Sequence, residues 1–212
     1  MKSTPILISL SLPPSKKPRT DGVHLSAIIR CIAQETGILK PEWCEDLSLL
    51  DLREITDPVA ILRISIGLAW EEWYIPNHLA KAFGVSDHPG ELCIDSIYMT
   101  PDGESLDVVI TQRDRKGHVI RIHEVKATYK STNTIGDDPD DPLYMMQIKG
   151  YCKGADTRHA ALHILFLCGD YKFPIQPQLK CWNLEFTQEE IDDNWSLMTE
   201  YRDHRMKMEK KS

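Results

Sequence analysis

The sequence has no apolar run long enough to cross a bilayer. The longest, around Ala161–Cys168, is far shorter than the roughly 20 residues that a spanning helix needs. Within Met1–Arg19 a short apolar stretch precedes the basic residues, whereas a secretory signal has the opposite order. We therefore expect a cytoplasmic protein with no membrane partner.

The sequence also has no Cys-x-x-Cys pair and no cysteine cluster. Its six cysteines are scattered, which is typical of free thiols in a reducing compartment rather than of a disulfide framework: Cys31, Cys44, Cys93, Cys152, Cys168 and Cys181.

An excess of positive charge is absent as well, since the 212 residues carry a formal net charge of −7. This argues against a protein that binds nucleic acid through bulk electrostatic attraction. It leaves open an enzyme whose acidic residues hold cations while a local basic strip holds phosphates. The hydrophobic fraction of 42% is enough for a buried core.

The N-terminal part of the chain is expected to be helical. Residues 1–21 are rich in Ser, Pro and Lys and are predicted to be a flexible leader. Apolar residues at helical spacing predict a helix over Val23–Thr36, which Gly37 ends. The same periodicity over Ile61–Phe83 predicts a second helix, interrupted near Pro76.

The middle of the chain changes to a period of two. Strands are predicted at Glu91–Met99, Ser105–Thr111 and Val119–Ala127, separated by turns at Thr100–Gly103 and Arg113–Gly117. Three short strands joined by tight turns predict an antiparallel meander.

The rest of the chain alternates between the two periods. After a polar loop we expect a helix, two strands and a last helix that opens with a Thr-x-x-Glu capping box, at Leu143–Lys153, His163–Cys168, Cys181–Phe186 and from Thr187 with Glu190. The order of elements predicts an α/β sandwich around a mixed sheet.

A carboxylate and an ammonium group are predicted to lie side by side on the third strand. Because side chains alternate along a strand, Glu124 and Lys126 share one face while Val125 points into the core. Asp95 is expected to reach that face from a neighbouring strand. Two carboxylates bind Mg²⁺ or Mn²⁺, and the backbone carbonyl of Val125 is a candidate further ligand.

This set of groups suits the cleavage of phosphodiesters. A metal neutralises phosphate oxygens and lowers the pKa of a bound water, and Lys126 can orient that water or stabilise the developing charge. A Glu-x-Lys tripeptide alone is common, however, and an ordinary ion pair on a surface strand is the alternative reading.

Four segments together resemble a known superfamily. Ile94–Asp95 with Glu124–Thr128 is similar to motifs II and III of the PD-(D/E)xK nucleases, and Gln147–Tyr151 resembles the Q-x-x-x-Y motif of the RecB-like and lambda-exonuclease-like branch. Gly67–Glu71 resembles the G-x-x-x-E helix motif of that branch. The resemblance implies a restriction-endonuclease-like αβββαβ core, Mg²⁺ or Mn²⁺ dependence and DNA as substrate.

The resemblance also implies roles for side chains on the two helices. Glu71 would join the metal site; of the adjacent pair, the spacing from Gly67 favours it over Glu72, because neighbours on a helix point about 100° apart. Gln147 would bond near the catalytic centre and Tyr151 would contact DNA. Nearby lysines are candidates for phosphate contacts, with a solvated basic face as the alternative: Lys130, Lys149 and Lys153.

The sequence departs from the superfamily pattern at two points. Ser96 follows Asp95 where many relatives have Gly, and neither upstream histidine, His24 or His78, lies in a metal-ligand motif. Some RecB-like nucleases carry an iron–sulfur cluster, but the C-terminal cysteines here are spaced too widely, so we expect none.

We therefore predict a single nuclease domain over residues 22–212, with a core at about 60–186 and a C-terminal helix at 187–207. The expected activity is that of an exonuclease in phage-type recombination, repair or replication, in the cytoplasm of a bacterial host. The alternatives are a structure-specific or nicking endonuclease and a catalytically silent DNA-binding module. A phage single-strand-annealing or replication protein is a candidate partner, and a homo-oligomer is compatible with the sequence.

Overall fold

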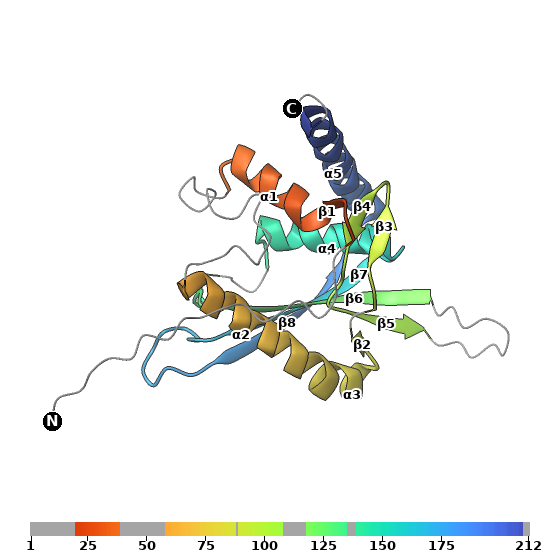
Figure 1. The fold of residues 1–212 in the computed structure, drawn as a ribbon. Helices are drawn as coiled ribbons and strands as arrows, with labels where there is room; N and C mark the ends of the chain where they lie inside the picture. The colour runs from red at the N-terminus through yellow and green to blue at the C-terminus, as the bar shows by residue number, and fades with distance from the viewer. Residues whose placement is uncertain (1–19, 39–57, 88, 108–117, 135–138, 210–212) are drawn as a thin grey trace.

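The computed structural model describes residues 20–38, 58–87, 89–107, 118–134 and 139–209 (Figure 1). The predicted leader lies outside this range except for its last two residues. The predicted turn at Arg113–Gly117 and the second-strand residues beyond Asp107 also lie outside it. No helix in the described part of the chain is both long and apolar enough to span a membrane.

A five-stranded sheet runs through the centre of the molecule in the order β2-β5-β6-β7-β8. Strands β6 and β7 pair in parallel and the other neighbours are antiparallel. The strands are β2 Ser86–Asp87, β5 Gly103–Asp107, β6 His118–Thr128, β7 His159–Phe166 and β8 Gln178–Glu185. The sheet is therefore mixed, as predicted.

A second, smaller sheet has the order β1-β4-β3. Its strands are β1 Val23–His24, β3 Leu92–Ile94 and β4 Ile97–Met99. The sequence prediction of one strand over Glu91–Met99 is wrong, because Asp95 and Ser96 have positive φ angles of 50° and 60° and turn the chain back into a two-residue hairpin. The predicted three-stranded meander is therefore divided between two sheets.

Helices cover both faces of the central sheet. One layer contains α1 Leu25–Glu35, α4 Pro142–Gly154 and α5 Gln188–Glu209, and the opposite layer contains α2 Pro58–Tyr74 and α3 Ala80–Phe83 (Figure 1). The parallel β6 and β7 are joined through α4, as a crossover requires. This confirms the predicted α/β fold with a mixed sheet flanked by helices.

The sheet separates two hydrophobic clusters. The larger lies beneath α1, α4 and α5 and includes Ile122 of β6 together with Leu162 and Ile164 of β7. The smaller lies beneath α2 and includes Val125 of β6 with Tyr74 and Leu79. Successive side chains of β6 thus point to opposite faces of the sheet and pack in different layers.

Two local predictions, the capping box of α5 and the interruption near Pro76, can be compared with the structure. The capping box of α5 is formed, since the Thr187 hydroxyl accepts from the Glu190 amide at 3.1 Å and the Glu190 carboxylate accepts from the Thr187 amide at 2.8 Å. The predicted interruption near Pro76 is a π-helical turn, Ile75–Leu79, that joins α2 to α3. A π turn accommodates the proline, which has no N–H to donate, without ending the helix.

Candidate active site

The centre of the site is a carboxylate on β6. The Glu124 side chain has no exposed surface, and apart from the Lys126 ammonium its oxygens have no hydrogen-bond partner. Lys126, whose side chain is 26% exposed, lies on the same face and forms an ion pair with Glu124. A buried carboxylate with one ion-pair partner and no further hydrogen bonds costs several kcal/mol. Such a group is unusual in a purely structural role.

The second carboxylate of the site is Asp102, on the connection between β4 and β5. Its Oδ2 atom accepts a hydrogen bond of 2.8 Å from the Val125 amide and lies 4.0 Å from Lys126 Nζ. Because a main-chain bond holds it, the position of Asp102 follows from the backbone of β6. Asp102, Glu124 and Lys126 therefore come together.

The structure does not bring Asp95 to this site, so that part of the sequence prediction is wrong. Asp95 is exposed in the β3–β4 hairpin, where its Oδ2 atom accepts a hydrogen bond of 2.8 Å from Trp195 Nε1 and its carbonyl accepts one from Arg202. The hairpin belongs to the small sheet, so Asp95 does not lie next to β6.

A signal for Asp102 was present in the sequence. The dipeptide Pro101–Asp102 has the Pro-Asp order that the name of the PD-(D/E)xK superfamily spells out, whereas its turn propensity alone predicts only a loop. In the structure Asp102 lies in the connection that leads into β5.

The charges of these groups influence one another strongly. Burial, together with the negative charge of Asp102, raises the pKa of Glu124, and the ammonium group of Lys126 opposes that rise. Burial opposes the charge of Lys126, but the carboxylates of Glu124 and Asp102 outweigh it and raise the pKa of the lysine. The site therefore holds a lysine that stays protonated beside a carboxylate with an elevated pKa.

Glu71 of α2 lies close enough for its charge to raise the pKa of Glu124 further. Glu71 is partly buried, whereas Glu72 is exposed. The choice of Glu71 over Glu72 thus agrees with the geometry. Packing does not explain the glycine of the G-x-x-x-E segment, because a Cβ atom on Gly67 would meet no atom within 4 Å.

Gln147 and Tyr151 of α4 form a bonded pair at the site. The Gln147 Nε2 group donates to the Tyr151 hydroxyl at 2.7 Å. Tyr151 is 6% exposed, and burial together with the charges of Glu124 and Asp102 raises its pKa. The phenol therefore stays neutral and faces the carboxylates.

The three lysines predicted to contact phosphates each lie near a carboxylate. Lys130 pairs with Asp141 at 2.8 Å, and Lys153 pairs with Asp192 of α5 at the same distance. Lys149 pairs with Glu190 at 3.4 Å and also lies over the ring of Phe186. Lys149 and Lys153 thus join α4 to α5, while a role in binding phosphate stays a prediction for all three.

The side chains suited to a divalent cation are those of Asp102, Glu124 and Glu71. Their oxygens are the ligand type that Mg²⁺ and Mn²⁺ prefer, and Glu124, which has no hydrogen-bond partner apart from Lys126, keeps lone pairs that a cation could use. In the described part of the chain, no three His, Cys, Asp or Glu side chains are gathered as a finished metal cluster. The proposed ligand role of the Val125 carbonyl stays a prediction.

The sequence matches no protein-family model and no curated protein. The fold, by contrast, is similar to solved structures. An alkaline exonuclease (LHK-Exo) from Laribacter hongkongensis has a TM-score of 0.54 and 14% identity, over 90% of this chain and 92% of that one. Its complex with dAMP has a TM-score of 0.51 and 14% identity, over the same shares. The fold of this chain is thus similar to that of an alkaline exonuclease.

A phage-related exonuclease from Haemophilus somnus 129PT has a TM-score of 0.49 and 14% identity, over 88% of this chain and 96% of that one. LHK-Exo is matched along most of its own length. At 14% identity the likeness to LHK-Exo establishes the architecture, whereas the chemistry has to be argued from the site itself.

Proposed function

We propose that this protein is a metal-dependent DNA nuclease of the PD-(D/E)xK type that hydrolyses phosphodiester bonds, acting as an exonuclease. The observation that carries the proposal is the fully buried Glu124 carboxylate, which has no hydrogen-bond partner apart from Lys126 and lies beside Asp102. The exonuclease fold of the structural neighbours supports it.

In this proposal Glu71, Asp102 and Glu124 hold Mg²⁺ or Mn²⁺. When bound, the cation supplies charge neutralisation at the phosphate and a water of lowered pKa. The Val125 amide keeps the Asp102 carboxylate in place through its hydrogen bond. The Lys126 ammonium is held protonated by the surrounding carboxylates, so it can donate to a phosphate oxygen and stabilise the charge that develops there.

Gln147 and Tyr151 act as positioning residues in the proposed reaction. The Gln147 amide orients the Tyr151 hydroxyl through its 2.7 Å bond, and the neutral phenol can donate to an anionic oxygen. The predicted setting, phage-type recombination, repair or replication in a bacterial cytoplasm with a single-strand-annealing or replication partner, extends this proposal.

The decisive experiment compares two aspartates. Asp102→Asn removes a charge from the site, so we expect degradation of a linear duplex with Mg²⁺ or Mn²⁺ to slow at least 100-fold. Asp95→Asn is the matched control, because Asp95 is exposed in a different sheet; we expect it to retain activity within about threefold. If Asp95→Asn is inactive and Asp102→Asn is active, the site is wrongly assembled.

Two further measurements separate the alternatives. An exonuclease degrades linear DNA and spares a closed circle, whereas a nicking or structure-specific endonuclease cuts circular or branched DNA. A silent DNA-binding module would show no cleavage of any DNA form and no uptake of Mn²⁺ in a calorimetric titration. That combined result would refute the proposed function.

A further inference from the structure

A group of exposed aromatic and apolar side chains lies on the connection between β7 and β8 and beside it. The exposed fractions are 36% for Tyr129, 52% for Tyr171, 96% for Phe173 and 56% for Ile175. With Lys172 we call this surface the aromatic platform. A phenylalanine with almost its whole surface in water contributes nothing to the core, and clustered exposed apolar groups generally mark a binding surface.

The platform is anchored to the rest of the molecule. The Thr132 amide donates to the Gly169 carbonyl at 2.9 Å, and the Tyr171 hydroxyl donates to the carbonyl of Tyr129. Gly169 has a φ angle of +53°, and a Cβ atom there would collide with the backbone of Gln176. The two arms of the connection therefore approach closely at Gly169, which holds the exposed rings in a defined place.

Two exposed cations lie in or beside the platform although the whole chain is acidic. The Lys172 side chain is 80% exposed, and its ammonium lies 3.5 Å from Asp170. Arg63, exposed near the start of α2, lies with its guanidinium 5.8 Å from the centre of the Tyr129 ring. Lys130, next to Tyr129, pairs with Asp141. Lys172 and Arg63 thus place positive charge beside the exposed rings, the sign that a phosphate requires.

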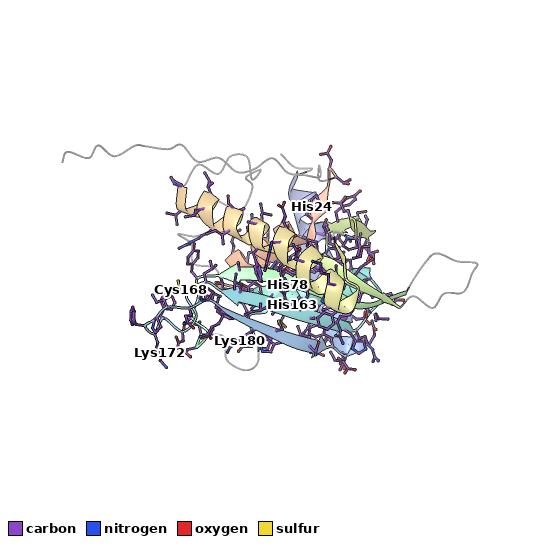
Figure 2. The ribbon with its side chains drawn as sticks, turned by 90° about the horizontal axis from the view of Figure 1, so that it is seen from below. His24, His78, His163, Cys168, Lys172 and Lys180 are labelled. Carbon is purple, nitrogen blue, oxygen red and sulfur yellow. The ribbon has the colours of Figure 1, made fainter. Side chains whose placement is uncertain are left out.

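The platform is also continuous with the candidate active site. Lys130, next to Tyr129, lies with its ammonium 6.0 Å from the centre of the Tyr144 ring. The pKa of Tyr144 responds to the charges of Lys126 and Glu124, so its phenol lies within reach of the catalytic groups. Figure 2 shows Lys172, Lys180 and Cys168 together at one end of the sheet, and Figure 1 shows the β7–β8 connection projecting there beside the start of α2.

We propose that the aromatic platform binds single-stranded DNA outside the active site, with Phe173 and Tyr171 stacking on bases and Lys172 contacting a phosphate. Single strands expose base faces that a duplex conceals, and exposed rings among basic side chains are the chemistry that holds them. The proposal rests on the proposed function only in taking DNA as the partner.

The test measures binding rather than cleavage. A fluorescently labelled 15-nucleotide deoxythymidine strand is titrated with full-length protein in EDTA, and anisotropy gives the Kd. We expect Phe173→Ala to weaken binding at least fivefold, because each base–aromatic stack contributes about 1–3 kcal/mol. Lys172→Gln is expected to weaken binding about two- to threefold and to make it less dependent on salt.

The matched control is Phe83→Ala, which removes an aromatic ring that is 65% exposed on α3, at the opposite end of the α2–α3 layer from the start of α2 that borders the platform (Figure 1). We expect its Kd to stay within a factor of 1.5 of the unaltered protein. An equal loss of affinity for the strand in both variants, or an unchanged Kd for Phe173→Ala, would refute the proposed role of the platform. Circular dichroism melts of both variants verify that each is folded.

The outcome is independent of catalysis. Binding that depends on Phe173 in a protein without cleavage activity would support the platform and refute the nuclease. Cleavage activity together with a Kd for the single strand that is unchanged in Phe173→Ala would support the nuclease and refute the platform. A third arm uses vesicles of phosphatidylcholine and phosphatidylglycerol: if Phe173→Ala abolishes vesicle binding but leaves DNA binding unchanged, the platform is a lipid surface and the proposal is wrong.

Discussion

The two faces of β6 bury polar side chains in opposite ways. On the face toward α4, Glu124 is fully buried, and its oxygens have no hydrogen-bond partner apart from the Lys126 ammonium. On the face toward α2, His123 is also buried, yet both of its ring nitrogens have partners: Ser105 Oγ at 2.8 Å and His163 Nε2 at 3.2 Å. We call the Glu124 side the unsatisfied face of the strand and the His123 side the satisfied face.

The satisfied face continues into a chain of polar groups. His163 Nδ1 lies 3.3 Å from both the Tyr74 hydroxyl and the Cys181 thiol. The rings of His123 and His163 stack with their centres 5.4 Å apart, and Figure 2 shows His163 beneath the helical layer that carries His78. This chain joins β5, β6, β7, β8 and α2.

The difference between the faces separates function from structure. A buried polar chain with every member bonded stabilises a fold and needs no ligand. A buried carboxylate that only a lysine neutralises is costly, and this cost is understandable if an incoming cation or substrate uses the group. Three predictions follow this contrast, from the largest expected effect to the smallest.

The unsatisfied face is tested by Glu124→Gln. We expect cleavage to fall at least 1,000-fold, because the site loses a central charge, while the free energy of unfolding changes by less than about 1 kcal/mol, since removal of a buried charge offsets the loss of the ion pair with Lys126, which keeps Asp102 nearby. Nuclease assays and urea unfolding give the two numbers. Glu72→Gln, at an exposed position on α2, is the control and should change neither.

A loss of several kcal/mol of stability in Glu124→Gln would contradict this account. It would mean that Glu124 stabilises the fold as a structural ion pair with Lys126. The contrast between the two faces of β6 would then disappear.

The satisfied face is tested by His163→Leu. This change leaves His123 Nδ1 without its partner and takes one partner from the Tyr74 hydroxyl. We expect the free energy of unfolding to fall by about 2–3 kcal/mol, because buried polar groups lose hydrogen-bond partners. Nuclease activity per folded molecule should be retained. Unchanged stability would show that the polar chain contributes little. His204→Gln, at an exposed histidine, is the matched control.

The third effect is the pH dependence of stability, which is the smallest of the three when it is expressed per histidine and per pH unit. Burial, with the nearby charges of His163 and Arg121, lowers the pKa of His123 to about 3, and burial with Arg121 lowers that of His163 to about 4. Between about pH 6.5 and 4 the unfolded chain therefore binds protons that the folded protein excludes. Stability should fall with decreasing pH by about 1.4 kcal/mol per unit for each histidine.

The measurement is urea unfolding at pH 7, 6 and 5, compared between the unaltered protein and the two histidine variants. His163→Leu should reduce the pH slope of the unfolding free energy, because one excluded proton is removed. His204→Gln should retain the full slope. Equal slopes in all three proteins would show that these histidines do not govern the acid response.

Local rules correctly anticipated the features that neighbouring residues determine. Thr187 and Glu190 form the expected capping box because both partners lie within one helical turn. Gly37 follows α1 with a φ angle of +72°, as expected of a helix-ending glycine. The alternation of Glu124, Val125 and Lys126 follows from the pleat of a strand, whatever that strand pairs with.

Features that depend on distant pairing were missed or misplaced. Asp95 and Asp102 both precede β6 in short turns, and spacing alone does not distinguish them. Only the pairing of β4 with β1 and β3, and of β5 with β6, removes Asp95 from the site and places Asp102 in it. The polar chain through His163 and Cys181 was not foreseen either, because its members lie up to 107 residues apart.

The amino-acid order alone was thus sufficient for the α/β class, the helix ends and the charged face of β6, since these follow from side-chain periodicity and capping within a few residues. Tertiary structure decided which aspartate joins Glu124 and Lys126, and which buried polar groups are bonded. Those outcomes depend on strand partners and on desolvation by layers that are remote in the sequence, and no local pattern encodes them.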